Sequence, residues 1–355
     1  MKAMNLKSKQ QGIALITVLM IAAVLIMFAT FIINDRQVSD RRTFNIINNA
    51  RASEYMVGAE VFGKSLLEQY FEQSKAERVV RTQPWATNPM QFPIENNLGT
   101  LEGQVRDMHS CFNLNSILME AQNAVPETGG ELAADELRDN TSSETIDQTN
   151  EFGKQLPGEK IYIKLIETLL PSEIEATPAE LAATLRDWID EDLEVSGADG
   201  AEDYTYTGYE IPYRTGNTLL GHTSELMVIK GYTPEIYDSI KDYICVLPTK
   251  EGTINVNTVQ PEQALLVWAL LDDVDLATVQ QVLQDMPEEG YSEGDFFTAL
   301  GNGKTSPEAA GRLAFDSKYL LMTATANIHT GRAQTKSLLL KNQNQFQVVA
   351  RHIGD

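Results

Sequence analysis

The sequence predicts an α+β protein, with one long N-terminal helix, a helix-rich middle and a C-terminal antiparallel sheet. Three observations support this fold class. A 21-residue apolar run begins near the N-terminus and continues as a helical pattern, helix-like segments fill the middle, and short strand-like segments follow Phe315. The chain has 355 residues, enough for about two ordinary domains.

Composition excludes several classes of function. The chain carries 28 Lys+Arg and 50 Asp+Glu, a net charge of -22, which argues against nucleic-acid binding because phosphates require clustered positive charge. Two cysteines are too few for a Cys-rich zinc site, and four scattered histidines offer little for a His-based metal centre. With 43% apolar residues, the chain can bury a core.

The N-terminal segment predicts a membrane span. Residues 1–12 hold three lysines and no acid, and Ile13–Ile33 contains no charge. A helix of 21 residues spans roughly 31 Å, about one bilayer core. The lysines before it and Asp35 after it place residue 1 in the cytoplasm and the rest outside. A cleaved signal peptide or a plain signal anchor are the alternatives, but the run exceeds a usual signal core and no small-x-small site follows.

The helical pattern continues beyond the membrane. No proline occurs between Ile13 and Gln83, so one helix is expected from Ile13 to about Phe71. Its second half is amphipathic, and one face is expected to pack on a globular domain. That face consists of Phe44, Ile47, Arg51, Tyr55, Ala59, Phe62, Leu66 and Tyr70.

The basic leader, Gly12 and the run IALITVLMIAAVL resemble a type IV prepilin-like signal. The resemblance implies that prepilin peptidase cleaves between Gly12 and Ile13, that the new terminus is N-methylated, and that the apolar segment later packs inside a filament. The family usually has Glu at the fifth mature position, where this chain has Thr17. The K-type minor pseudopilins of type II secretion lack that glutamate. A buried carboxylate is costly unless paired, and a tip subunit has no subunit above it to supply the partner.

The middle of the chain contains a short internal echo. Trp85–Leu98 is expected to be a loop and Thr100–Met108 a strand, after which FNLNS (Phe112–Ser116) is echoed by INVNT (Ile254–Thr258). Asn and Ser/Thr there suit helix N-caps, so the echo predicts a structural repeat, with chance as the alternative. Glu262–Leu300 has a helical pattern, and the polar Glu127–Asn150 is expected to be a flexible loop.

Acidic residues crowd after a helix predicted from Ala179 to about Ile189. Between Pro126 and Asp203 there are 21 acids and 5 bases, a net of -16. Carboxylates are unfavourable at a helix C-terminus, where the dipole is negative, and calcium accepts six to eight oxygen ligands in flexible geometry. The spacing is not that of an EF-hand. A solvated acidic loop without metal is the alternative.

The resemblance favours calcium, because K-type pseudopilins bind it in their helical domain and DWIDED…GAEDYTY is similar to their pattern. It implies one or two calcium ions. The expected ligands are Asp190, Asp192, Asp199, Glu202 and Asp203.

Catalytic motifs find no support in the sequence. Paired carboxylates could serve glycoside hydrolysis, but an exposed acidic loop gives no sign of the pocket that a catalytic acid needs. GNGKT at Gly301–Thr305 resembles half a P-loop, but Thr298 stands where its first glycine is required. G-x-S-x-G, H-E-x-x-H and G-x-G-x-x-G are absent. We therefore expect no enzyme, no catalytic residue and no small-molecule substrate.

Two cysteines end strand-like runs beyond the membrane. Adjacent strands could bring Cys111 and Cys245 into a disulfide in an oxidising space, and two buried free thiols are the alternative. After Phe315, the segments YLLMTATANIHTG, TKSLLLKN and QFQVVARH indicate strands joined by turns.

The resemblance implies a pilin-like fold, in which the long helix packs on the antiparallel sheet and a large all-α, SAM-like domain is inserted. The expected segments are a leader (1–12), a membrane and filament-core helix (13–33), its amphipathic continuation (34–75), the start of the core (76–112), the insert (113–311) with modules at about 113–245 and 255–311, and the C-terminal strands (312–355).

The resemblance implies a minor pseudopilin at the tip of the type II secretion pseudopilus. It would be a single-pass inner-membrane protein with a large periplasmic domain. Its expected partners are the I- and J-type minor pseudopilins, the major pseudopilin, prepilin peptidase and the inner-membrane assembly platform. A minor pilin of a surface pilus, acting in adhesion, and a membrane-anchored calcium-dependent enzyme are the alternatives.

Overall fold

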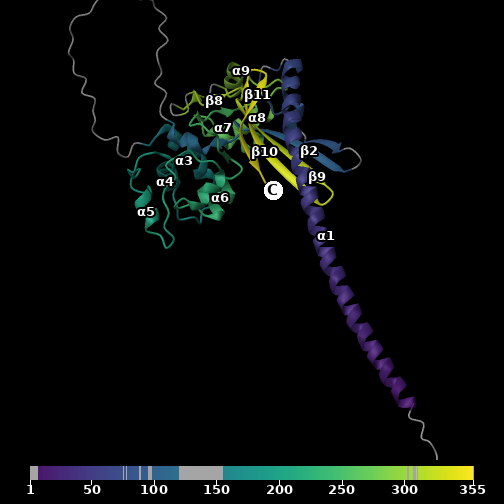
Figure 1. The fold of residues 1–355 in the computed structure, drawn as a ribbon. Coiled ribbons are helices and arrows are strands. Elements are labelled where there is room, and N and C mark those ends of the chain that lie inside the picture. Colours follow the sequence, from purple (N-terminus) through teal and green to yellow (C-terminus); the bar gives the residue numbers. More distant parts are fainter. Residues whose placement is uncertain are drawn as a thin grey trace, which may run out of the picture.

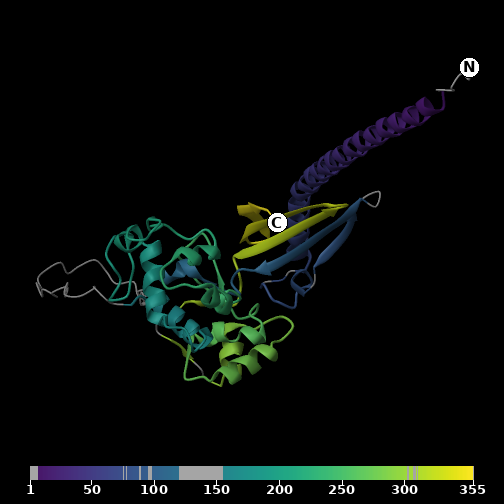
Figure 2. The ribbon, with the colours of Figure 1, turned by 90° about the horizontal axis from the view of Figure 1, so that it is seen from below.

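A long N-terminal helix and a five-stranded antiparallel sheet form one part of the molecule, and a helical region lies beside them (Figures 1 and 2). This computed structural model describes residues 7–74, 76, 78–87, 89–94, 98–119, 155–301, 304–306, 309 and 311–354. The polar segment Glu127–Asn150, expected to be a loop, lies outside the described residues.

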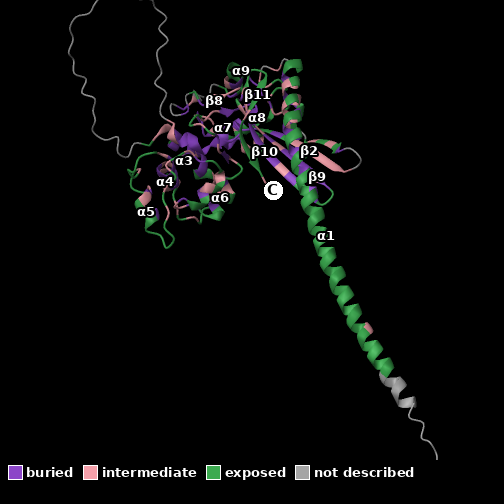
Figure 3. Ribbon diagram, in the orientation of Figure 1, coloured by how far each residue is buried: buried purple, intermediate pink, exposed green. Residues whose placement is uncertain are grey.

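Helix α1 runs without interruption over Lys7–Ser74, which confirms the single long helix. Its first half projects away from the rest of the protein, and its second half packs mainly on β9 (Tyr319–Ile328) and β10 (Gly331–Asn342) (Figure 1). The projecting half is exposed along the length that is described, except at Ala22, which is partly buried (Figure 3). This division of α1 agrees with the sequence pattern. The apolar first half suits lipid or a helical bundle, and the amphipathic second half packs on a folded domain.

The face of α1 that meets the sheet differs from the predicted one. Of the predicted residues, Ala59 is buried, whereas Phe44, Ile47 and Phe62 remain 44–49% exposed. Ala52 and Ala59 pack with Met56 against alanines of the sheet, where the backbones approach closely, and the larger Leu67 and Phe71 fill the core nearer the end of the helix. The residues of α1 that are buried are Asn48, Ala52, Met56, Ala59, Glu60, Leu67 and Phe71.

The sheet has the strand order β1-β2-β9-β10-β11, with all neighbours antiparallel. Its other strands are β1 (Met90–Ile94), β2 (Gly99–Asp107) and β11 (Gln345–Ile353). Two-residue turns join β9 to β10 and β10 to β11, which confirms the C-terminal antiparallel strands.

The expectation of a loop over Trp85–Leu98 was wrong. This stretch contains the end of a short helix, α2 (Pro84–Thr87), and strand β1. Strand β1 is an edge strand with Pro93 in it, and it is held by pairing with β2 and by a ring contact between Phe92 and Phe62 of α1. Proline is tolerated at a sheet edge, and only these tertiary partners make the segment a strand.

The helical region is inserted in the chain between β2 and β9, and it forms one continuous hydrophobic core. The helix expected from Ala179 to about Ile189 and the helices expected within Glu262–Leu300 are present. Its first part contains η2 (Leu114–Leu118), α3 (Pro157–Leu169), α4 (Pro178–Ile189), α5 (Asp203–Thr207), η3 (Thr223–Val228) and α6 (Pro234–Ile240). Its second part contains η4 (Pro261–Gln263), α7 (Leu265–Trp268), α8 (Leu276–Gln284) and α9 (Glu293–Ala299).

Short paired strands accompany these helices. Strand β3 (Phe112–Asn113) pairs in parallel with β4 (Ile244–Cys245), and β5 (Ile254–Asn255) pairs in parallel with β8 (Leu313–Ala314). A third, antiparallel pair joins β6 (Leu271–Asp272) to β7 (Lys304–Thr305). The two parallel pairs each contain the first asparagine of one echoed motif.

The two asparagine motifs share one local hydrogen bond, which is consistent with a structural repeat. The Asn113 side chain accepts from the Asn115 N–H, and the Asn255 side chain accepts from the Asn257 N–H. Asn113 caps η2 as predicted, whereas Asn255 opens a turn that is not yet helical. The second asparagine of each motif is fully buried.

Each of these buried asparagines makes three hydrogen bonds to distant backbone. In each copy the side-chain oxygen accepts one N–H, and the amide group donates to two carbonyls. The three bonds nearly exhaust the capacity of the amide, so each asparagine ties its module together. They join Asn115 to Leu220 and Leu247, and Asn257 to Tyr291 and Phe315.

Candidate functional site

The N-terminal half of α1 is the first functional feature. Among the described residues, α1 is the one helix long and apolar enough to cross a membrane. The Thr17 hydroxyl donates to the Ala14 carbonyl at 2.9 Å, so the side chain that replaces the family glutamate is satisfied within its own helix. Gly12 and Ile13 belong to α1, and the burial of these two residues lies outside the described part.

The acidic cluster forms where the chain leaves α4 and returns to α5. Carboxylate oxygens of Asp190, Asp192 and Glu202 all lie within 4.8 Å of one another. Asp190 ends α4 as its C-cap, and Glu202 immediately precedes α5. The loop between the two helices therefore brings together three of the five predicted ligands, which are separated by up to twelve residues in the sequence.

The other two predicted ligands lie outside this group. The Asp203 carboxylate accepts hydrogen bonds from the Thr215 N–H at 3.0 Å and the Thr215 hydroxyl at 2.8 Å, and Arg214 lies 3.5 Å away. The Thr215 hydrogen bonds lower the pKa of Asp203. Asp199 is exposed on the loop, and its backbone carbonyl accepts from Lys230. The structure thus gives these two acids different surroundings from the clustered three.

Two of the three clustered carboxylates have buried oxygens without donors, whereas Asp192 is exposed and accepts from the Glu194 N–H at 2.8 Å. Within the described part of the chain, Asp190 Oδ1 and both side-chain oxygens of Glu202 are buried and have no hydrogen-bond partner, and Glu202 is only 3% exposed. Burial, reinforced by the neighbouring acids, raises the pKa of Glu202 to about 8 and that of Asp190 to about 7. Unpartnered buried oxygens are costly, and a bound cation would satisfy all of them at once.

Asp187 is a buried acid beside the cluster that the ligand prediction did not include. It is fully buried, and its carboxylate accepts from the Ser196 N–H at 2.9 Å and the Ala201 N–H at 2.7 Å. These bonds fold the loop back onto α4. A Cβ at Gly200 would lie 2.2 Å from Asp187 Oδ2, so the loop requires glycine there. No local pattern identifies this role, because the partners of Asp187 are backbone N–H groups 9 and 14 residues further along the chain.

Arg186 supplies positive charge beside the cluster. Its guanidinium lies 3.6 Å from Asp190 Oδ2 and 3.1 Å from Glu159 Oε2. Glu159 is itself buried, and that burial raises its pKa. One arginine therefore pairs with two carboxylates, while the Glu202 side-chain oxygens have no hydrogen-bond partner among the residues that the structure describes. These residues could hold a metal ion through oxygen ligands.

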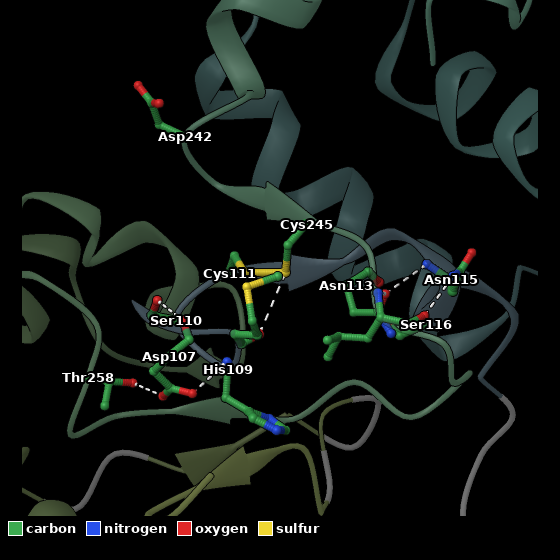
Figure 4. Close-up of a disulfide and its surroundings, with 12 residues drawn as sticks. Asp107, His109, Ser110, Cys111, Asn113, Asn115, Ser116, Asp242, Cys245 and Thr258 are labelled. Atoms are coloured by element: carbon green, nitrogen blue, oxygen red, sulfur yellow. Dashed lines mark hydrogen bonds between the residues drawn. A yellow bond between two sulfur atoms is a disulfide. The ribbon is translucent and has the colours of Figure 1, made fainter. Parts of the chain in front are cut away.

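A disulfide joins Cys111 and Cys245 across the β3–β4 pair (Figure 4). Their Cα atoms are 5.7 Å apart, and both residues are buried. Cys111 immediately precedes β3, and Cys245 is the last residue of β4. Because β3 and β4 are paired, the two sulfur atoms lie close together. The bridge closes the chain segment that contains α3, α4, α5, α6 and the acidic cluster.

Comparisons with known proteins cover nearly the whole chain. Two family models, both described as type II secretion system (T2SS), protein K, match residues 110–249 and 254–316. Type II secretion system protein K of Aeromonas hydrophila is 31% identical over 350 residues, covering 98% of this chain and 97% of that protein. The protein of the same name from Klebsiella pneumoniae is 29% identical over 352 residues, with 98% and 97% covered.

A solved structure shows the same fold. The crystal structure of the GspK-GspI-GspJ complex from the enterotoxigenic Escherichia coli type 2 secretion system contains a chain that is 25% identical, with a TM-score of 0.68. The match covers 88% of this chain and 99% of the chain in that complex.

These relatives distinguish among the functions considered from the sequence. They are named as components of a secretion system, which favours a structural secretion protein over a surface-pilus adhesin or a calcium-dependent enzyme. The similarity extends from the N-terminal helix through the helical insert to the C-terminal strands. This chain belongs to the type II secretion system protein K family.

Proposed function

We propose that this protein is the minor pseudopilin at the tip of a type II secretion pseudopilus, where it initiates or caps the filament with I- and J-type pseudopilins. The observation that carries the proposal is similarity along almost the full chain to protein K, including a solved complex that contains GspK, GspI and GspJ. The action is assembly for the export of folded periplasmic proteins. No catalytic step is involved.

Two features support a position at the tip. Thr17 replaces the family glutamate and is satisfied by its own helix, so the chain does not require the terminal amine of a subunit above it. The helical region also extends sideways from the sheet, well away from the axis of α1 (Figure 2). Such bulk is hard to accommodate within a packed shaft and is tolerated at its end.

The N-terminal residues provide processing and membrane attachment in this proposal. Prepilin peptidase removes residues 1–12 by cleaving between Gly12 and Ile13, and the new terminus is methylated. Segment 13–33 then holds the protein in the inner membrane as a single span, with the large domain in the periplasm. The major pseudopilin and the inner-membrane assembly platform are the further partners as the helix enters the filament.

The proposed domains follow the boundaries expected from the sequence. The pilin-like core combines residues 34–112 with 312–355, and the insert spans residues 113–311. The matched hydrogen bonds of Asn115 and Asn257 support two related modules, at about 113–245 and 255–311. We propose that both modules are SAM-like.

Calcium is the proposed ligand of the acidic cluster, with Asp190, Asp192 and Glu202 as its side-chain ligands. The fit rests on the unpartnered buried oxygens of Asp190 and Glu202, on the convergence of Asp192 with them, and on the preference of calcium for oxygen donors. Bound calcium would keep these carboxylates ionised and would hold the loop after α4 to the start of α5. Asp187 positions that loop through the backbone, and backbone carbonyls complete the ligand set.

Titration calorimetry on chelator-treated protein tests the metal. Glu202→Gln should weaken calcium binding at least tenfold, because it removes a buried ligand charge. Glu191→Gln is the matched control, since Glu191 is an exposed acid on the same loop. Equal affinities for the two variants, or no calcium binding by the parent protein, would refute the proposed site.

Mass analysis of the mature N-terminus and co-purification test the function. The mature chain should begin at methylated Ile13 and should co-purify with the I- and J-type pseudopilins. Gly12→Val should block processing and assembly while the periplasmic domain still folds. An intact leader in a fully assembled system would contradict the proposal.

A further inference from the structure

We propose that an exposed apolar patch on the helical region binds a protein segment in which lysine or arginine flanks an apolar side chain. The residues after α5 and the end of η3 form this surface, which we call the tyrosine patch. Helix α5 lies on the side of the helical region remote from α1, so the patch is separate from any packing between long helices (Figure 1). Its residues are Tyr209, Ile211, Tyr213, Met227 and Val228.

The tyrosine patch is apolar and open within the described part of the chain. Ile211 is 80% exposed, Val228 46% and Met227 39%, and Tyr209 adds an aromatic ring that is 40% exposed. Tyr213 joins the two segments. Its ring centroid lies 5.7 Å from that of Tyr209, and its hydroxyl donates to the Val228 carbonyl at 2.8 Å. Adjacent exposed apolar side chains of this kind are typical of a protein interface.

The exposed rings of the patch rest on a buried aromatic base. Trp188 and Tyr206 are 7% and 0% exposed, and their ring centroids are 5.3 Å apart. The Tyr213 ring lies 5.3 Å from Tyr206 and 6.2 Å from Trp188, and the Tyr209 ring lies 5.8 Å from Tyr206. Side chains that are already held in place lose little conformational entropy on binding, so this arrangement suits recognition.

The charge around the patch selects a positively charged partner. Residues 190–214, which follow α4 and include half of the patch, contain eight acids and one base. That base, Arg214, lies 3.5 Å from Asp203, whereas the exposed Glu210 makes no ion pair among the residues that the structure describes. Glu210 therefore offers a negative charge within the patch, and the tyrosine rings offer faces that attract lysine or arginine.

The same charges disfavour two other occupants. A segment that binds a membrane surface combines apolar side chains with Lys and Arg, and acids stand in their place here. A second copy of this chain would bring one acidic patch against another, in a protein whose net charge is -22. A basic protein segment with an apolar side chain complements both the acids and the apolar surface.

Photo-crosslinking of a synthetic peptide tests the patch. The probe carries one photo-leucine flanked by lysines, and the chain is used at full length in nanodiscs of phosphatidylcholine. Mass spectrometry should locate most adducts within residues 209–213 and 227–228. An otherwise identical peptide with glutamate in place of lysine should give at least tenfold less adduct.

Two sets of variants connect the adducts to the patch. Ile211→Ser combined with Val228→Ser should lower the yield at least fivefold, and Leu276→Ser is the control, because that leucine is 36% exposed on α8. Glu210→Gln should lower the yield about threefold, whereas Glu289→Gln, at an exposed acid in the second helical part, should leave it unchanged. All of these side chains are exposed, so the melting temperature of each variant should match that of the parent.

Each outcome supports the tyrosine patch or overturns it. Lysine-dependent adducts that decrease in both patch variants, and not in the controls, support it. Equal yields from the lysine and glutamate peptides overturn the chemistry of the partner. Adducts unaffected by the patch variants, or no adducts at all, overturn the surface.

A benzophenone amino acid at Ile211 tests the other occupants, in vesicles that contain phosphatidylglycerol and several copies of the chain. Adducts mainly with lipid, or mainly with a second copy of the chain, would contradict the basic protein segment. No filament partner is present in these experiments, so failure of the patch leaves the proposed function unaffected.

Discussion

At the scale of single residues, the buried carboxylates make stability depend on pH. Folded-state pKa values of about 8 for Glu202 and about 7 for Asp190 exceed unfolded values of about 4, so the calcium-free folded chain holds more protons between these limits. Its free energy of unfolding should therefore fall as pH rises from about 4 to about 8. Thermal melts in chelator should show the melting temperature dropping by several degrees across this range.

Calcium and a paired set of variants separate this effect from general acidity. Saturating calcium should remove most of the decrease in the free energy of unfolding at higher pH, because calcium favours the ionised carboxylates. Glu202→Gln should flatten the pH dependence in chelator, whereas the exposed Glu191→Gln should retain the parent slope. A slope unchanged by Glu202→Gln would mean that other groups govern the pH response.

The candidate ligands could be predicted only in part from the sequence. Crowded acids after a helix end predicted a metal site near residues 190–203, and three of the five named acids converge. Asp203 does not join them, because its carboxylate accepts hydrogen bonds from the backbone N–H and the hydroxyl of Thr215, twelve residues further along the chain. The role of Asp187 depends on the path of the loop, because its partners are backbone N–H groups of that loop.

At the scale of elements, the two asparagine motifs should stabilise separate modules. Asn115→Ala removes three buried hydrogen bonds and should lower the free energy of unfolding by about 2–4 kcal/mol. Asn257→Ala should cost a similar amount for the same reason. Hydrogen exchange should locate the loss near Leu220 and Leu247 in the first variant and near Tyr291 and Phe315 in the second. The same exchange pattern in both variants would argue against distinct modules.

The docking of α1 depends on one close backbone approach. A Cβ at Gly331, where β10 begins, would lie 2.5 Å from the carbonyl carbon of Asn48 on α1. Gly331→Val should therefore push the helix from the sheet and cost about 1–3 kcal/mol in chemical denaturation. Gly103→Ala on β2 is the control, since its Cβ would meet nothing within 4 Å. Comparable losses in both variants would show that strand glycines matter for a different reason.

A polar contact also joins this helix to the sheet. Glu60 of α1 accepts from Arg351 Nε at 2.7 Å and from the Ser337 hydroxyl at 2.5 Å. The hydrogen bond with Arg351 lowers the pKa of Glu60. The helical periodicity alone did not identify the sheet-facing side, because alanines and the charged Glu60 face the sheet while Phe44, Ile47 and Phe62 stay largely exposed.

At the scale of the whole molecule, the disulfide links the two ends of the first helical part. Cys111 and Cys245 are separated by 134 positions, and a bridge across so long a segment restricts the unfolded chain strongly. Replacing both by serine should lower the free energy of unfolding by about 2–5 kcal/mol, measured by guanidinium denaturation. Parent protein treated with reductant should shift by the same amount. A stability unaffected by both treatments would show that the bridge does not form in solution.

The sequence by itself determined the α+β class, the long helix, the C-terminal strands, the leader motif with Thr17 and the repeated asparagine motifs. These features are encoded locally, by hydropathy, spacing and capping chemistry. Tertiary structure decided that β1 is a strand, that Ala52 and Met56 face the sheet, and that Asp190, Asp192 and Glu202 converge. Such outcomes depend on contacts between residues far apart in the chain, so no local pattern contains them.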